Sequence, residues 1–198
     1  MCAAHAKAHI ANSDNRARAI KRIVNNVPSN PGQGIKWRST TASDLTAIQK
    51  IASVAHPELS ERPEIFAEKL NLFPEGCFVL VQGRIVAGYA FVHPWHLNAI
   101  PKLDEFLVSL PTNSDCLLIH DVVVLQQARG KGASQSLVEL ISRLAKKHNL
   151  QFLTLVSVYG SHLLWARYGF EPATGITLVP KLTWYGETAR FMVRRLDW

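Results

Sequence analysis

Cysteine is scarce in this sequence, and its three cysteines form no recognisable pattern. Cys2, Cys77 and Cys116 are an odd number and show no CxxC spacing. Such usage argues against a disulfide framework and against a zinc site, and it is typical of a reducing compartment. We therefore expect a cytoplasmic protein without a bound metal.

Long apolar runs are absent as well. No run reaches the ~18 residues that a membrane-spanning helix needs, so we expect no membrane partner. The N-terminal residues lack the apolar core of a secretory signal. Instead, residues 1–34 carry five basic side chains against the single acidic Asp14, and they end in a cluster of proline and glycine. This composition predicts a basic N-terminal extension over residues 1–34, with a mitochondrial transit peptide as a minor alternative, and one domain over residues 35–198.

Acidic residues are outnumbered, since 22 Lys and Arg stand against 15 Asp and Glu, for a net charge of +7. A positive chain suits an anionic ligand or a nucleic acid. The basic residues are spread along the chain, however, and no nucleic-acid-binding motif occurs beyond residue 34. We therefore expect an anionic ligand and no nucleic acid partner. The apolar fraction of 47% is sufficient for a full hydrophobic core.

What is present, from residue 35 onward, is a regular series of strand and helix patterns. Hydrophobic periodicity and turn residues define them, with Ser43 or Asp44 as the cap of one helix and Ser60 as the cap of the next. The expected elements are a strand at 35–41, helices at 44–56 and 60–73, a hairpin over 77–94 that turns at 82–84, a short helix at 102–110, a buried strand at 116–125, a helix at 134–148, a strand at 151–158, a short helix at 161–170 and a closing hairpin over 176–196.

One short segment carries a candidate binding motif. Gln127-Ala128-Arg129-Gly130-Lys131-Gly132-Ala133 follows the buried strand and opens a helix. The first N–H groups of a helix attract anions, and glycines allow close approach of the backbone. The nucleotide-binding GxxxxGK[ST] motif is absent, and GxGxxG would need a glycine where Gln135 stands. The alternative is a solvated basic turn.

This segment resembles the Q/R-x-x-G-x-G/A signature of the GCN5-related N-acetyltransferase (GNAT) superfamily. The preceding "DVVV" is similar to the family's fourth strand, and "WARYGF" to the short helix and Gly-Phe before its sixth strand. The resemblance implies an α/β (α+β) fold with a mixed central sheet of about six to seven strands, the fourth and fifth splayed around the cofactor, and helices on both faces. It also implies acetyl-CoA as co-substrate, an amine as acceptor, and a monomer or homodimer.

The resemblance assigns the cofactor site to two adjacent stretches. The backbone of Val122, Val123 and Val124 would pair with the pantetheine arm and donate to the oxyanion. The pyrophosphate would lie against the loop and the start of the next helix. The residues implied there are Gln127, Arg129, Gly130, Lys131, Gly132, Ala133 and Ser134.

Two residues of the buried strand are candidates for the general base that frees the amine from its proton. His120 and Asp121 are ionisable inside an apolar strand, which is costly unless they are paired or used. Strand alternation predicts that they face opposite sides, so that only one reaches the acceptor cleft. A structural role for both is the alternative. His93 and His96 are expected at the mouth of that cleft.

The sequence departs from the family at the acid that protonates the leaving thiolate. Trp165 stands where the family has a tyrosine, and an indole does not titrate. Tyr159 is our first candidate for a replacement, with Ser161 and His162 as alternatives. Nothing beside Cys116 would lower its pKa for nucleophilic catalysis. The substituted tyrosine keeps a second function open, that of a non-catalytic module that binds CoA.

Overall fold

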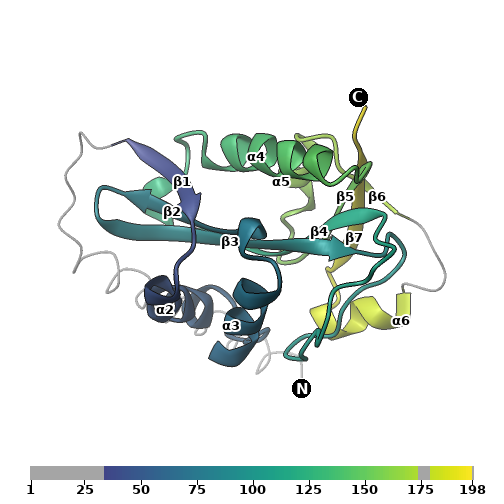
Figure 1. Cartoon of the computed structure of the whole chain (residues 1–198), viewed down its shortest axis with the longest axis horizontal. Coiled ribbons are helices and arrows are strands. Elements are labelled where there is room, and N and C mark those ends of the chain that lie inside the picture. The colour runs from purple at the N-terminus through teal and green to yellow at the C-terminus, as the bar shows by residue number, and fades with distance from the viewer. Residues whose placement is uncertain (1–33, 174–178, 198) are drawn as a thin grey trace, which may run out of the picture.

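A seven-stranded sheet with helices on both faces forms the centre of the computed structural model, which describes residues 34–173 and 179–197 (Figure 1). Its strands follow the order β1-β2-β3-β4-β5-β7-β6, and the β4–β5 pair is parallel whereas the other pairs are antiparallel. The strands are β1 (Ile35–Ser39), β2 (Cys77–Gln82), β3 (Ile85–Trp95), β4 (Cys116–Val124), β5 (Phe152–Ser157), β6 (Glu171–Pro172) and β7 (Arg190–Arg195). The mixed sheet and the hairpin that turns between β2 and β3 are as predicted.

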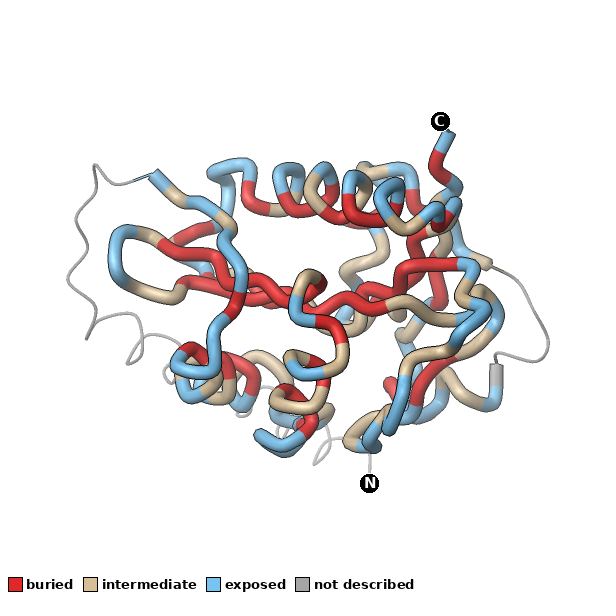
Figure 2. Tube along the Cα trace, viewed as in Figure 1, coloured by how far each residue is buried: buried red, intermediate tan, exposed pale blue. Residues whose placement is uncertain are grey.

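The helices cover the two faces of the sheet and bury its apolar side chains (Figure 2). α4 (Ala133–Lys147) and α5 (His162–Ala166) lie on one face, and α2 (Leu45–Ala55) and α3 (Pro63–Leu72) lie on the other. The amphipathic α4 packs Leu137 and Ile141, both fully buried, into a hydrophobic core between this helix and the sheet. On the opposite face, Ile48 and Phe66 pack against Tyr89 of β3. Such burial is the main stabilising term of the fold.

β4 and β5 pair over only part of their length. Their parallel ladder runs from Cys116 opposite Phe152 to Ile119 opposite Leu155. Beyond this point β4 continues along β3 and β5 continues along β7. The two strands therefore part in the middle of the sheet, which confirms the predicted splay.

β4 also contains a β-bulge where it parts from β5. Phe91 lies opposite Asp121 and Val92 lies opposite Ile119, so His120 is an extra residue on β4. A bulge breaks the alternation of side chains between the two faces. As a result, His120 and Asp121 both project toward the side of α2 and α3, where His120 meets Glu61 in the α2–α3 connection and Asp121 meets His56 at the end of α2. The prediction that they face opposite sides is wrong for this reason.

Asp44, one of the two residues predicted to cap α2, is its observed N-cap, whereas the predicted cap of α3 differs from the observed one. α2 is preceded by a 3-10 turn at Ala42–Asp44, and the Asp44 carboxylate accepts hydrogen bonds from Arg38 and the Thr41 N–H. Ser43 is therefore not the cap. α3 starts at Pro63, with Arg62 in place of Ser60 at its cap position, because proline suits the first turn of a helix.

The expected short helix at 102–110 is not observed. Instead, this stretch of the 96–115 connection is irregular and is tied to α3. The Glu68 carboxylate accepts the N–H groups of Leu107 and Val108, both at 2.8 Å. A side chain distant in sequence thus satisfies amides that a helix would have satisfied with its own carbonyls.

The predicted closing hairpin is also wrong. Residues 179–185 form α6 (Val179–Leu182) and a 3-10 turn (Thr183–Tyr185), while residues 174–178 lie outside the described residues. Pro180 cannot donate to a strand ladder but is tolerated in the first turn of a helix. β7 pairs instead with β5 and with the two-residue β6. The proposed extension over residues 1–34 falls, apart from Gly34, outside the described residues.

Among the helices that the structure describes, none combines the length and the apolar character needed to span a bilayer.

The close approach of β3 and β4 at Gly88 gives a first prediction. A Cβ added at Gly88 would lie 2.4 Å from the carbonyl oxygen of Val123. We expect Gly88→Ala to lower the free energy of unfolding by about 1–3 kcal/mol, because the overpacked strands must separate. Denaturant unfolding of Gly34→Ala is the control, since a Cβ there meets no atom within 4 Å. Equal stability of the two variants would contradict this account.

Candidate functional site

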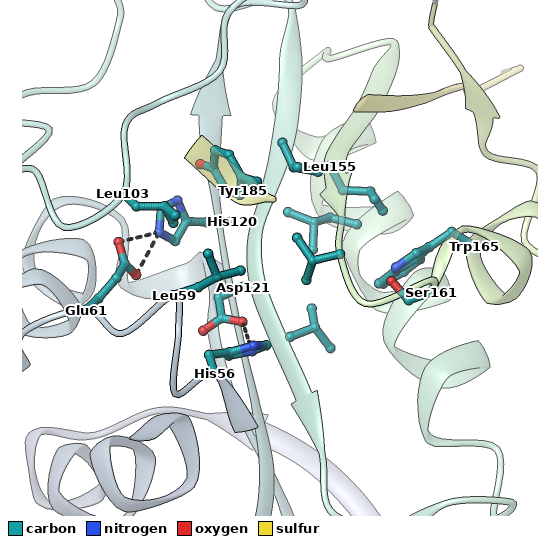
Figure 3. Close-up of a pocket in the computed structure, with 14 residues that line it drawn as sticks. His56, Leu59, Glu61, Leu103, His120, Asp121, Leu155, Ser161, Trp165 and Tyr185 are labelled. Atoms are coloured by element: carbon teal, nitrogen blue, oxygen red, sulfur yellow. Dashed lines mark hydrogen bonds and ion pairs between the residues drawn. The ribbon is translucent and has the colours of Figure 1, made fainter. Parts of the chain in front are cut away.

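A pocket opens where β4 and β5 part (Figure 3). Its volume is about 80 Å³, enough for several water molecules or a small polar group. β4 and β5 supply its walls, the α2–α3 connection closes one side, and Leu103 and Tyr185 close another. The described residues that line it are His56, Leu59, Glu61, Leu103, Ile119, His120, Asp121, Val122, Leu155, Val156, Val158, Ser161, Trp165 and Tyr185.

Glu61 is the centre of a buried charge cluster on one side of the pocket. Its two carboxylate oxygens lie 3.1 and 3.0 Å from His120 Nε2, and Oε1 lies 3.7 Å from Lys69 Nζ. Oε1 also accepts the Asp104 N–H at 3.3 Å. The side chains of Glu61, Lys69 and His120 are 4%, 2% and 3% exposed. Glu61 therefore joins α3, β4 and the 96–115 connection through one group.

The electrostatics of this cluster keep Glu61 charged. Burial alone would raise its pKa, but the charge and hydrogen bond of His120, together with Lys69, hold it at about 2. Burial lowers the pKa of Lys69, against the attraction of nearby carboxylates. Burial and the neighbouring His120 lower the pKa of His93 to about 3, so His93 is neutral near pH 7. The cluster thus presents a carboxylate bound to an imidazole.

Asp121 is held by a second set of partners. Tyr89 donates a hydrogen bond to its Oδ2 at 2.6 Å, and His56 Nε2 lies 3.1 Å from its Oδ1. Burial and the charge of Asp121 raise the pKa of Tyr89 well above its ordinary value, so the phenol stays protonated and donates. The ring of His56 stacks on that of Tyr159, with centroids 5.7 Å apart. Asp121 is therefore fixed in position while its side chain remains 16% exposed to the pocket.

The glycine loop lies at the start of α4, directly beyond the end of β4. Gly130 and Gly132 adopt φ values of +74° and +79°, which favour glycine, and nothing lies within 4 Å of a Cβ built at either. Trp37 donates its indole N–H to the Ala133 carbonyl at 2.9 Å, and Arg129 Nε donates to the Val124 carbonyl at 2.9 Å. The loop thus exposes open backbone at the start of a 15-residue helix, whose first N–H groups have no partner within the helix, and such an arrangement favours an anion.

The other residues predicted to bind the cofactor lie in different environments. Val122 lines the pocket, whereas Val123 is buried on the α2 side and Val124 leads into the loop, of which Gln127 and Ser134 are half-buried. Lys131 is exposed beside the open glycines.

The candidate acids fall at different places. Tyr159 is 44% exposed, stacks on His56 and is not among the lining residues. Ser161 lines the pocket, and its hydroxyl lies 3.1 Å from that of Ser157. Trp165 is 8% exposed and packs edge-to-face on Phe170. His162 is not a lining residue.

Three further candidates lie away from the acceptor cleft. His93 is buried behind His120, and His96 is exposed, so neither lines the pocket in the described part of the chain. Burial raises the pKa of the Cys116 thiol to about 12, which makes it a poor nucleophile.

Sequence reasoning missed Glu61, His56, Lys69 and Tyr185. A signal existed for Lys69, since it shares the buried face of α3 with Ile65 and Phe66 at helical spacing, where a charge needs a partner. No comparable signal marks His56 or Glu61, which lie in the connection between α2 and α3.

No group of three or more His, Cys, Asp and Glu side chains suited to a metal ion occurs within residues 34–173 and 179–197.

The fold and site define a class of protein. The mixed sheet that opens between two parallel strands is the fold of several solved acetyltransferase structures, and the sequence profile identifies the family. The profile of the Acetyltransferase (GNAT) family matches residues 44–170, and the chain belongs to this family. A search among curated proteins gave no significant match.

Solved structures share the fold. Ard1 from Thermoplasma volcanium aligns with a TM-score of 0.65 at 15% identity, over 83% of this chain and 99% of that chain. N-acetylglutamate synthase from Neisseria gonorrhoeae, complexed with coenzyme A and N-acetyl-glutamate, aligns with a TM-score of 0.62 at 18% identity, over 83% of this chain and 35% of that chain. The ribosomal-protein-S18-alanine N-acetyltransferase from Escherichia coli aligns with a TM-score of 0.58 at 18% identity, over 83% of this chain and 95% of that chain. At these identities the similarity concerns the fold.

The buried position of Glu61 predicts a pH-dependent contribution to stability. Glu61→Gln leaves His120 and Lys69 without their counter-charge, and we expect a loss of about 3–5 kcal/mol at pH 7. The folded-state pKa of Glu61 is lowered from 4.5 to about 2. Its stabilisation is therefore present above about pH 4.5 and is lost as the pH falls toward 2.

Denaturant unfolding of wild type and variant between pH 7 and pH 3 measures this difference. We expect the gap in unfolding free energy to shrink below about pH 4.5. Glu64→Gln, at an exposed position on α3, is the control, and its unfolding free energy should equal that of the wild type. A gap of constant size across this range would contradict the proposed charge of Glu61.

Proposed function

We propose that the chain is an acyl-CoA-dependent N-acyltransferase that moves an acetyl group from acetyl-CoA directly to an amine. The observation that carries this proposal is the parting of β4 and β5, which opens a pocket with a carboxylate-bound histidine on the strand that leads to the glycine loop at the start of α4. The family membership supports the reaction class.

The cofactor would lie along the open edge of β4. Up to Ile119 this edge pairs with β5, and over residues 120–124 no described strand pairs with it. Its backbone can therefore bind the pantetheine amides as it would bind a neighbouring strand, and an N–H in Val122–Val124 can donate to the oxyanion. The pyrophosphate would bind at the glycine loop, with Arg129 and Lys131 as cations at its rim.

His120 is the general base in this proposal, and Glu61 positions it. A charged carboxylate only accepts, so His120 Nε2 must carry the proton that Glu61 accepts. The lone pair of the ring then lies on Nδ1, which is buried without a hydrogen-bond partner among the described residues. Glu61 thus fixes the tautomer of His120 and stabilises the imidazolium that forms, as the aspartate carboxylate does in a Ser-His-Asp triad.

The reaction balances without a covalent enzyme intermediate. The ammonium gives one proton to His120, and the neutral amine attacks the thioester carbon. As the C–N bond forms and the C–S bond breaks, the nitrogen releases a second proton, which balances the proton that the leaving thiolate takes up. The products are the amide and CoA, whose thiolate takes up a proton. Tyr159 and Ser161 stay candidates for the donor of that proton, and Ser161 is the one that lines the pocket.

One assay tests the reaction and its alternative, a CoA-binding module without turnover. The alternative rests on Trp165, which packs in the core where the family has a titrating tyrosine. The protein is incubated with acetyl-CoA and a panel of primary amines and peptides, and thiol release is followed. CoA binding without release on any acceptor would favour the module, and absence of CoA binding would refute both functions.

The glycine loop predicts a charge-sensitive CoA site. Gly130→Asp and Gly130→Asn introduce side chains of equal size, and both residues tolerate the left-handed φ better than most. Only Asp places a negative charge beside the pyrophosphate. We expect CoA to bind Gly130→Asp at least about tenfold more weakly than Gly130→Asn, as measured by titration calorimetry. Equal affinities of the two variants for CoA would indicate that the pyrophosphate does not bind at this loop.

The base assignment predicts a selective loss of turnover. We expect His120→Ala to lower kcat by about 10²–10⁴, because the carboxylate of Asp121 is a weaker base than an imidazole, with little change in CoA affinity. His148→Ala, at the C-cap of α4 beside Glu75, is the matched control and should keep wild-type turnover. Loss of CoA affinity in step with kcat would point instead to a structural role for His120.

A further inference from the structure

The acceptor side of the pocket carries two carboxylates and no lysine or arginine among the described lining residues. From this charge pattern we infer that the acceptor is an alkyl amine with no carboxylate beside its nitrogen, and not a free α-amino acid. The inference rests on the proposed function and names the substrate class for the same pocket.

Asp121 is the group that would receive the ammonium of such an acceptor. Tyr89 donates to one of its oxygens and His56 lies against the other, which leaves lone pairs on both, and the side chain remains partly open to the pocket. A cationic amine entering the pocket meets this fixed negative charge before His120 removes its proton. A carboxylate on the same carbon would meet the same charge and be repelled.

The cations nearest to the pocket are already engaged. Lys69 is buried behind Glu61, 3.7 Å from its Oε1, and it is not a lining residue. Arg62, next to Glu61 in sequence, donates from Nε to the Asp104 carboxylate and from its terminal nitrogen to the Asp104 carbonyl, both at 2.9 Å. Neither is placed to pair with the carboxylate of an amino acid.

The other walls favour a methylene stem. Leu59 and Leu103 line the pocket on the side of Glu61 and Asp121, and Leu155 lines it from β5 (Figure 3). Val158, just beyond β5, is also a lining residue. These side chains offer apolar contact to the carbons that carry the amine. The chemistry fits the end of a lysine side chain or of a small diamine.

Three acceptors that share one alkyl chain distinguish the effect of a charge beside the nitrogen from the effect of its size. Pentylamine has no group beside the nitrogen, norleucine adds a carboxylate there, and norleucine amide adds a neutral group of the same size. kcat/KM is measured by thiol release and expressed per ammonium form, which is the form that Asp121 would receive. We expect pentylamine to exceed norleucine by at least about tenfold, with the amide much nearer to pentylamine.

Each other outcome overturns a part of the inference. Equal use of norleucine and its amide would remove the role of charge. A strong preference for the amide over pentylamine would assign a peptide N-terminus instead of an alkyl amine. Thiol release with none of the three, nor with any amine of the wider panel, would refute the proposed function itself. Cadaverine and Nα-acetyl-lysine amide, run in parallel, distinguish a diamine from a lysine side chain.

A charge placed in the pocket wall gives an independent readout. Leu59→Lys adds a cation at the mouth, and Leu59→Met adds a neutral stem of similar length. We expect the ratio of kcat/KM for norleucine to that for pentylamine to rise at least about tenfold in Leu59→Lys and to stay near wild type in Leu59→Met. An unchanged ratio in Leu59→Lys, with normal CoA affinity, would overturn the inference.

Discussion

The buried carboxylate of Glu61 is the interaction on which the site depends. It meets His120 of β4, Lys69 of α3 and the backbone of Asp104 in the 96–115 connection. A charge taken out of water is costly unless every partner is in place. These three segments therefore have to reach their positions together, and the side of the pocket that Glu61 and His120 line forms only when they do. The same requirement fixes the orientation of the His120 ring.

The bulge in β4 brings this cluster to the place where the sheet opens. Without the extra residue, His120 and Asp121 would project to opposite faces, and Asp121 could not reach Tyr89 while His120 reached Glu61. With it, two differently held groups lie side by side on the face covered by α2 and α3. One is a carboxylate fixed by a protonated phenol, and the other is an imidazole fixed by a carboxylate. Two such environments allow neighbouring groups to take different roles in proton transfer.

The parts of the fold that could be predicted from the sequence are those that local patterns determine. The apolar run of β4, the glycines after it and the amphipathic α4 are continuous in sequence, and they indicated the sheet, the loop and the family. The bulge depends on pairing with β3, and the Glu61–His120 contact joins residues 59 apart, so neither leaves a local pattern. Similarly, the amides of Leu107 and Val108 bind Glu68 rather than forming a helix, and α6 replaces a strand where Pro180 cannot join a ladder.

The position of Trp165 shows which half of the proposed chemistry depends on the protein. Its indole packs with Phe170 in the core and supplies no proton. An aliphatic thiol has a pKa of about 8.5, whereas an alkyl ammonium has a pKa of about 10.4. Near neutral pH a thiolate can leave at little cost, but the amine must first lose a firmly held proton. In the proposed reaction, His120, Glu61 and Asp121 would therefore serve the more demanding proton transfer, from the amine, and the tryptophan at residue 165 would leave the less demanding one, to the thiolate, to another donor.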